Sequence, residues 1–183
     1  MTPAPRLTTD EYLRTPETVL PQELVYGVMR VADAPAPRHQ AALRDVGVAL
    51  VRHLDEHPVG QVWFAPVDVV LDRARALVVQ PDLIFVSTGR LRIVQDRVWG
   101  APDLVLEVLS PRPRIGRLDE RVGWFAEYGV RECWLLQQDE RRLDVLTFKG
   151  RRLSSQQSFS AGERILSAVL PAFDLSLQSM LRA

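Results

Sequence analysis

Two periods of hydrophobic residues alternate along this chain, and together they predict a mixture of helices and strands. Apolar positions recur at helical spacing from 38 to 57, which predicts a long amphipathic helix that ends at Pro58 and Gly60. A second helix is expected over 118–128, because Gly129 suits the position just after a helix. Shorter helices are predicted at 8–13 and 173–181.

Strands are expected where short apolar or alternating runs lie between residues that break regular structure. They cover 23–32, 61–72 as a hairpin or a strand bent at Pro66, 132–138, 142–149 and 154–159. Several connections are too short for a crossover, so part of the sheet must be antiparallel. The predicted fold class is therefore mixed α+β, with one mixed central sheet flanked by helices, in a single domain over residues 1–183.

Two further apolar runs each contain a carboxylate where a buried strand should contain none. Asp82 lies within 78–86 and Glu107 within 104–109, and both runs are apolar on both faces, as central strands are. An unpaired ionised carboxylate there would cost several kcal/mol, so each needs a cation or a strong donor. If the two strands are neighbours, one divalent metal would serve both carboxylates, which is the interpretation we favour. An arginine partner for each is the alternative.

Asp103 precedes Glu107 on the same expected strand. Four residues of strand separate the two side chains by about 13 Å, which is too far to share a metal. We therefore expect Asp103, which follows Pro102, to be a residue of the strand start.

Composition restricts the partners and the chemistry. The formal net charge is zero, so no overall field draws the chain to nucleic acid or membrane, and nucleic-acid contact would need a local patch. A single cysteine, no apolar signal core at the N-terminus and no apolar run near 20 residues favour a cytoplasmic protein without a membrane segment. The chain has 22 arginines but one lysine, Lys149, so a mechanism that needs a lysine has almost no candidate.

The stretch from His53 to His57 matches the H-x-x-E-H pattern of some zinc proteases. It lies in the last helical turn before Pro58, and the sequence offers no further histidine pair or cysteine cluster as support. We therefore expect these histidines not to bind zinc.

Several segments in order resemble one bacterial family. They are Glu23-Leu24-Val25-Tyr26-Gly27, Ala36-Pro37-Arg38-His39, Gln80-Pro81-Asp82-Leu83, the run from Ala101 to Pro111 and the run from Tyr128 to Trp134. Together they resemble the Uma-type family of predicted restriction endonucleases, within the PD-(D/E)xK nuclease superfamily, and the likeness is strongest over 7–150. The resemblance implies a restriction-endonuclease-like fold.

The same resemblance implies roles for individual residues. Asp82 and Glu107 would hold Mg²⁺ or Mn²⁺, and Glu23 would be an additional acidic member of the catalytic site. The lysine usual in this family corresponds to Arg121, which can stabilise charge on a phosphoryl group but cannot accept a proton near neutral pH. Tyr26 and Arg117 stand where the family commonly has aspartates. Glu23 could instead be an exposed acid at a strand edge.

Four residues are candidates for phosphate contacts beside the site. Arg112, Arg114 and Arg117 follow Glu107 closely, although they could equally form a solvated loop in an arginine-rich protein. His39 falls in the first turn of the long helix, where a capping or packing role is the interpretation we favour over a contact with the active site.

The sequence thus predicts a metal-dependent endonuclease that hydrolyses DNA phosphodiester bonds, with reduced activity because Arg121 replaces the usual lysine. The alternative is a catalytically degenerate member of the fold that binds nucleic acid or protein. A homodimer is expected, since two active sites would cut both strands of a duplex.

Overall fold

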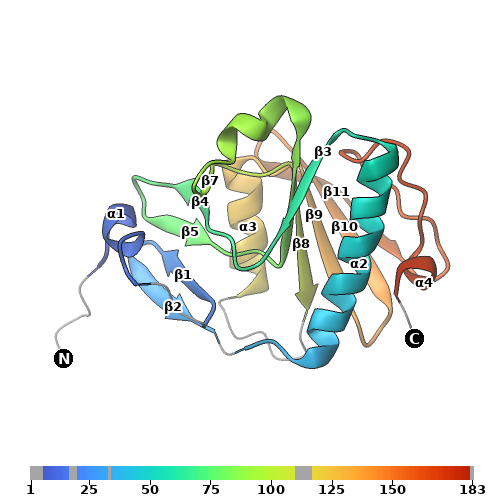
Figure 1. The fold of residues 1–183 in the computed structure, drawn as a ribbon, viewed down its shortest axis with the longest axis horizontal. Coiled ribbons are helices and arrows are strands. Elements are labelled where there is room, and N and C mark those ends of the chain that lie inside the picture. Colours follow the sequence, from blue (N-terminus) through green and yellow to red (C-terminus); the bar gives the residue numbers. More distant parts are fainter. Residues whose placement is uncertain (1–5, 17–19, 33, 110–116, 182–183) are drawn as a thin grey trace.

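The computed structural model describes residues 6–16, 20–32, 34–109 and 117–181, and its strands form two mixed sheets (Figure 1). The six-stranded sheet has the order β11-β10-β9-β8-β6-β3. Its strands are β3 (Gly60–Phe64), β6 (Leu83–Ser87), β8 (Leu104–Leu109), β9 (Glu132–Gln137), β10 (Arg142–Lys149) and β11 (Arg152–Phe159). Strands β8 and β9 are parallel, and the other neighbours are antiparallel.

The second sheet has five strands in the order β2-β1-β5-β4-β7. They are β1 (Gln22–Val25), β2 (Val28–Val31), β4 (Val69–Asp72), β5 (Leu77–Val79) and β7 (Val98–Trp99). The single strand predicted over 23–32 was wrong, because this segment is the β1–β2 hairpin. Tyr26 and Gly27 form its turn with φ of 50° and 85°, and a two-residue hairpin turn of this kind requires positive φ at both positions.

Two proline-containing segments connect the sheets. The run 78–86, predicted as one strand, is in fact β5 and β6 of different sheets, joined through Pro81. Likewise, the segment predicted over 61–72 divides into β3 and β4 around Pro66. Proline cannot donate to a strand ladder, so pairing stops there and the chain leaves one sheet for the other. The predicted mixed α+β class, with a mixed sheet flanked by helices, is confirmed, and the structure adds a second mixed sheet to it.

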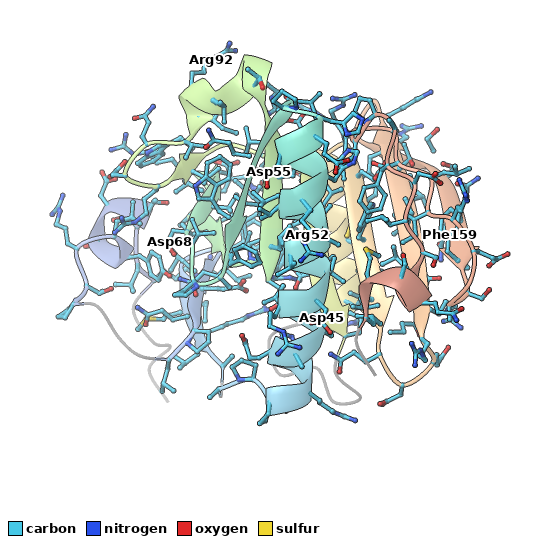
Figure 2. All side chains as sticks on the ribbon, turned by 45° about the vertical axis from the view of Figure 1, so that its right-hand side comes forward. Asp45, Arg52, Asp55, Asp68, Arg92 and Phe159 are labelled. Carbon is cyan, nitrogen blue, oxygen red and sulfur yellow. The ribbon has the colours of Figure 1, made fainter. Side chains whose placement is uncertain are left out.

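The two main helices lie close to their predicted positions. They are α2 (Pro37–Glu56) and α3 (Leu118–Tyr128), and α3 ends at Gly129 with φ 95°. On α2, Arg52 and Asp55 face solvent (Figure 2), whereas Leu50 and Leu54 are buried.

The described part of the chain also has three short helical segments. A capping box of Thr8 and Glu11 begins α1 (Thr9–Tyr12), and a six-residue 3-10 helix, η1 (Thr88–Ile93), follows β6. The C-terminal helix α4 (Leu177–Met180) is shorter than predicted, because the Ser176 side chain caps it and fixes its start there. No helix in these ranges is long and apolar enough to cross a membrane.

The two main helices cover opposite faces of the six-stranded sheet (Figure 1). The hydrophobic face of α2 packs with Leu104 and Leu106 of β8, whereas Trp124 and Phe125 of α3 pack with Val105. Because side chains alternate along a strand, Glu107 shares the face of Val105 and points toward α3. Residues of the five-stranded sheet belong to the same hydrophobic cluster as Val105, Trp124 and Phe125.

Candidate functional site

Asp82 and Glu107 lie side by side where β6 and β8 meet. Leu83 pairs with Leu106 in this antiparallel ladder, so the preceding residue Asp82 faces Glu107. The Val108 amide donates to Asp82 Oδ2 at 2.7 Å, which places the carboxylate against β8. The structure thus brings together the two carboxylates that the apolar runs singled out.

Arg121 of α3 bridges Glu107 and Glu23. Its Nε donates to Glu107 Oε1 at 2.6 Å, and its Nη1 donates to both oxygens of Glu23 at 2.8 and 2.9 Å. Glu23 Oε1 also accepts from the backbone amide of Gln80 at 2.6 Å. The Glu23 side chain is 1% exposed, so the alternative of an exposed strand-edge acid is wrong.

The cluster contains more acidic than basic side chains, and the pKa of Glu107 is raised. Burial raises the pKa of Glu107 to about 8; Arg121 opposes the shift, and the charges of Asp82 and Glu23 add to it. Burial acts to lower the pKa of Arg121, but the two glutamates outweigh it and raise that pKa above its usual value. Arg121 therefore stays charged, while Glu107 takes up a proton at a higher pH than an ordinary glutamate does.

His39 contacts the site directly. Its Nε2 lies 3.1 Å from Asp82 Oδ2, and this hydrogen bond raises the pKa of His39 against the opposing effect of burial. The cap position of α2 is Ala36, which offers no side-chain hydrogen bond. A capping role for His39 is therefore wrong, because a capping side chain lies at the N-cap and accepts from backbone amides. The ring is buried, as a packing role requires, and it contacts Asp82 as well.

Asp82 Oδ1 and Glu107 Oε2 accept no hydrogen bond from the described part of the chain. The side chains of Asp82 and Glu107 are 20% and 12% exposed. Within the described ranges, no three His, Cys, Asp or Glu side chains gather closely enough to form a metal cluster. A cation here would have two carboxylate ligands from these residues, which is a donor set that suits Mg²⁺, since this ion commonly keeps waters and takes one or two carboxylates.

Of the remaining candidates, Arg117 and Tyr26 lie in the described part of the chain, and neither has a contact with the carboxylates there. Arg117 is exposed and pairs with Asp119, so its guanidinium is not directed at the carboxylates. Arg112 and Arg114 lie outside the described residues. Tyr26 occupies the β1–β2 turn, where its ring packs edge-on against Trp124 and lies under the Arg75 guanidinium.

Sequence reasoning missed the contribution of backbone groups, since the amides of Gln80 and Val108 hold Glu23 and Asp82 respectively. No side-chain pattern reveals such donors. It also missed a second buried acid beside β8: Asp103 precedes the strand as expected, but its carboxylate is 0% exposed and binds Arg90 and the Ser87 amide.

His53 and His57 stack at the end of α2 with ring centroids 4.6 Å apart. His53 also packs edge-on against Phe173, and His57 Nδ1 lies 3.3 Å from the His53 carbonyl oxygen. These contacts give both rings a packing role, and their lack of zinc stays a prediction.

Glu107→Gln should stabilise the metal-free protein at high pH. Glutamine matches the protonated glutamate in shape and can still accept from Arg121. Because the wild-type pKa rises from 4.5 to about 8 on folding, wild-type stability falls as pH increases through that window. We expect the variant to equal the wild type near pH 4.5 and to exceed it by about 2 to 4 kcal/mol above pH 8.

Urea unfolding in a chelator at both pH values measures this difference, and Glu127→Gln on the exposed part of α3 is the matched control. A variant that is much less stable at every pH would show that Glu107 acts as the ionised partner of Arg121.

Comparison with known proteins assigns the chain, rather than individual site residues, to a family. The family model Uma2, described as "Putative restriction endonuclease", matches residues 9–178. The fold is similar to the crystal structure of a putative nuclease belonging to DUF820 from Anabaena variabilis ATCC 29413, with a TM-score of 0.79 over 96% of this chain and 97% of that chain. At 17% identity this likeness shows the fold alone, and it confirms the predicted nuclease-like fold. A comparison with curated proteins found no match. Because the family model covers nearly the whole chain, this protein belongs to the Uma2 family.

Proposed function

We propose that this protein is a metal-dependent endonuclease that hydrolyses DNA phosphodiester bonds, with Asp82 and Glu107 as ligands of Mg²⁺ or Mn²⁺. The observation that carries the proposal is the adjacent pair of carboxylates with one unpaired oxygen each, Asp82 Oδ1 and Glu107 Oε2. Three acids, counting Glu23, share one arginine and one histidine, so the cluster attracts a cation.

A bound divalent ion would supply an acidified water and neutralise charge on the scissile phosphate. The protein's own part is to hold the two carboxylates and to bring positive charge beside them. Arg121 uses Nε and Nη1 on the glutamates, while its Nη2 has no hydrogen bond within the described ranges and is free to meet a phosphate oxygen. Arg121 would then stabilise charge without accepting a proton.

A second candidate function is a catalytically degenerate protein that binds nucleic acid or protein. The observation in its favour is that Arg121 already neutralises part of the cluster, with hydrogen bonds to both glutamates. Such a protein would hold its fold without metal and would cut nothing.

The metal site is tested by Asp82→Ala. Wild type should bind Mn²⁺ in calorimetry, and the variant should show no binding, because it loses one of two ligands. Affinity should rise between pH 6 and pH 8, since binding must displace the proton that Glu107 holds at a pKa of about 8. Asp55→Ala, at an exposed position of α2, is the control. Equal binding by wild type and Asp82→Ala would refute the site.

DNA as substrate is tested by nicking of supercoiled plasmid with Mg²⁺ or Mn²⁺ and then with chelator. We propose that two copies act together on a duplex, so linear product should appear alongside nicked circles. Cleavage that persists in chelator would contradict metal dependence, and binding of plasmid without any cleavage would favour the degenerate protein.

A further inference from the structure

His39 connects the N-terminal turn of α2 to the candidate metal site. It is the third residue of a 20-residue helix, and its side chain is 10% exposed. Side chains at this position point back toward the helix start, which here brings the imidazole to the junction of β6 and β8. His39 and Asp82 are 43 positions apart in the chain, so this contact depends on how α2 packs against the sheet.

One oxygen of Asp82 receives both donors at this junction. Asp82 Oδ2 accepts from the Val108 amide at 2.7 Å and lies 3.1 Å from His39 Nε2. The two donors come from different elements, a strand and a helix, so together they fix the rotation of the carboxyl group. The other oxygen, Oδ1, is left without a protein donor among the described residues and is available to a cation.

The imidazole itself has a restricted environment. His39 Nδ1 is buried and has no hydrogen-bond partner in the described part of the chain. Asp82 is an acceptor, so Nε2 must carry the hydrogen of this contact. His39 therefore donates to Asp82 through Nε2. Because Nε2 carries a hydrogen, it is not available to bind a metal ion.

We propose that His39 is a positioning residue for the metal ligand Asp82, rather than a ligand or a phosphate contact. It holds Oδ2 against β8, which leaves Oδ1 to a cation that Glu107 would share. This inference rests on the proposed function, because a positioned ligand requires a metal to bind. Hydrogen bonds of this kind typically change metal affinity by about 10- to 100-fold when they are removed.

The test compares a substitution of His39 that keeps the hydrogen-bond donor with one that removes it. His39→Gln keeps an N–H donor near the position of Nε2, whereas His39→Phe keeps the ring and loses the donor. We expect Mn²⁺ affinity in calorimetry to fall by about 10- to 100-fold in His39→Phe and to recover most of that loss in His39→Gln. Thermal unfolding of each metal-free protein checks that the fold is intact, and His39→Leu replaces His39→Phe if the latter does not fold.

The arms of this experiment separate the two proposals. If wild type binds no Mn²⁺, the proposed metal site fails and the role of His39 fails with it. If wild type binds and His39→Phe binds equally well, the metal site stands and the positioning role is wrong. Equal losses in His39→Phe and His39→Gln would also overturn it, because the donor would then not be what matters.

Discussion

Replacing Arg121 with methionine should lower the free energy of unfolding by about 3 to 5 kcal/mol at pH 8. The Arg121 side chain is 9% exposed and forms hydrogen bonds to two carboxylates. Methionine fills much of the same volume, but it leaves the Glu23 carboxylate, 1% exposed, without a cation. Removing one partner of a buried ion pair is expensive because the remaining charge has lost its water and gains nothing in return.

The loss should depend on pH in a definite direction. Arg121 is the group that restrains the pKa of Glu107, so that pKa rises further in the variant. A protonated Glu107 needs no cation, so the part of the loss that comes from Glu107 should shrink as the pH falls from 8 toward 4.

Urea unfolding between pH 4 and pH 8 measures both effects. Arg117→Met, at the exposed start of the same helix, should change stability by about 0.5 kcal/mol or less and is the control. A loss for Arg121→Met no larger than this control would show that the bridge contributes little.

Replacing Arg121 with lysine should raise metal-dependent cleavage by about 10²- to 10⁴-fold. A guanidinium keeps its protons at any working pH, whereas a buried ammonium group can shift its pKa and transfer a proton. Arg121 is also fixed by three hydrogen bonds to Glu23 and Glu107, so it cannot move toward an attacking water. A lysine lacks the planar fork that satisfies both acids at once and would be less tightly held.

The measurement is single-turnover cleavage of plasmid by wild type and Arg121→Lys with Mg²⁺ or Mn²⁺. DNA affinity, measured with Ca²⁺ in place of the reactive metal, should change little because the positive charge is kept. Arg121→Met separates charge from proton transfer, since it should lose both DNA affinity and cleavage. Efficient cleavage by wild type, with a slower Arg121→Lys, would identify the arginine as a working catalytic group. Absence of cleavage in all three proteins would favour the degenerate protein.

Local patterns in the sequence were sufficient for the two main helices and for the two central carboxylates. The 3.6-residue period of α2, the glycine after α3 and the apolar runs around Asp82 and Glu107 each depend on neighbours in the chain. These features are encoded over a few residues, because helix periods, caps and strand burial act at that range. The family resemblance, built from short segments, likewise required no tertiary information.

Other features were decided only when distant segments packed together. The division of the expected sheet into two followed from Pro81 and Pro66, whose effect on strand pairing depends on which neighbours are available. Backbone donors such as the Val108 amide carry no signature in the sequence, because every residue but proline has the same group.

The chemistry of the site shows the same division. The sequence by itself determined that two acids lie in apolar runs, that Arg121 stands where the family usually has a lysine and that one lysine remains in the whole chain. Only the tertiary structure decided that Arg121 reaches Glu23, 98 positions away, and that His39 turns toward Asp82. The physical reason is that burial and charge pairing are properties of the assembled core. There, helix α3 brings Arg121 to Glu23 of one sheet and Glu107 of the other.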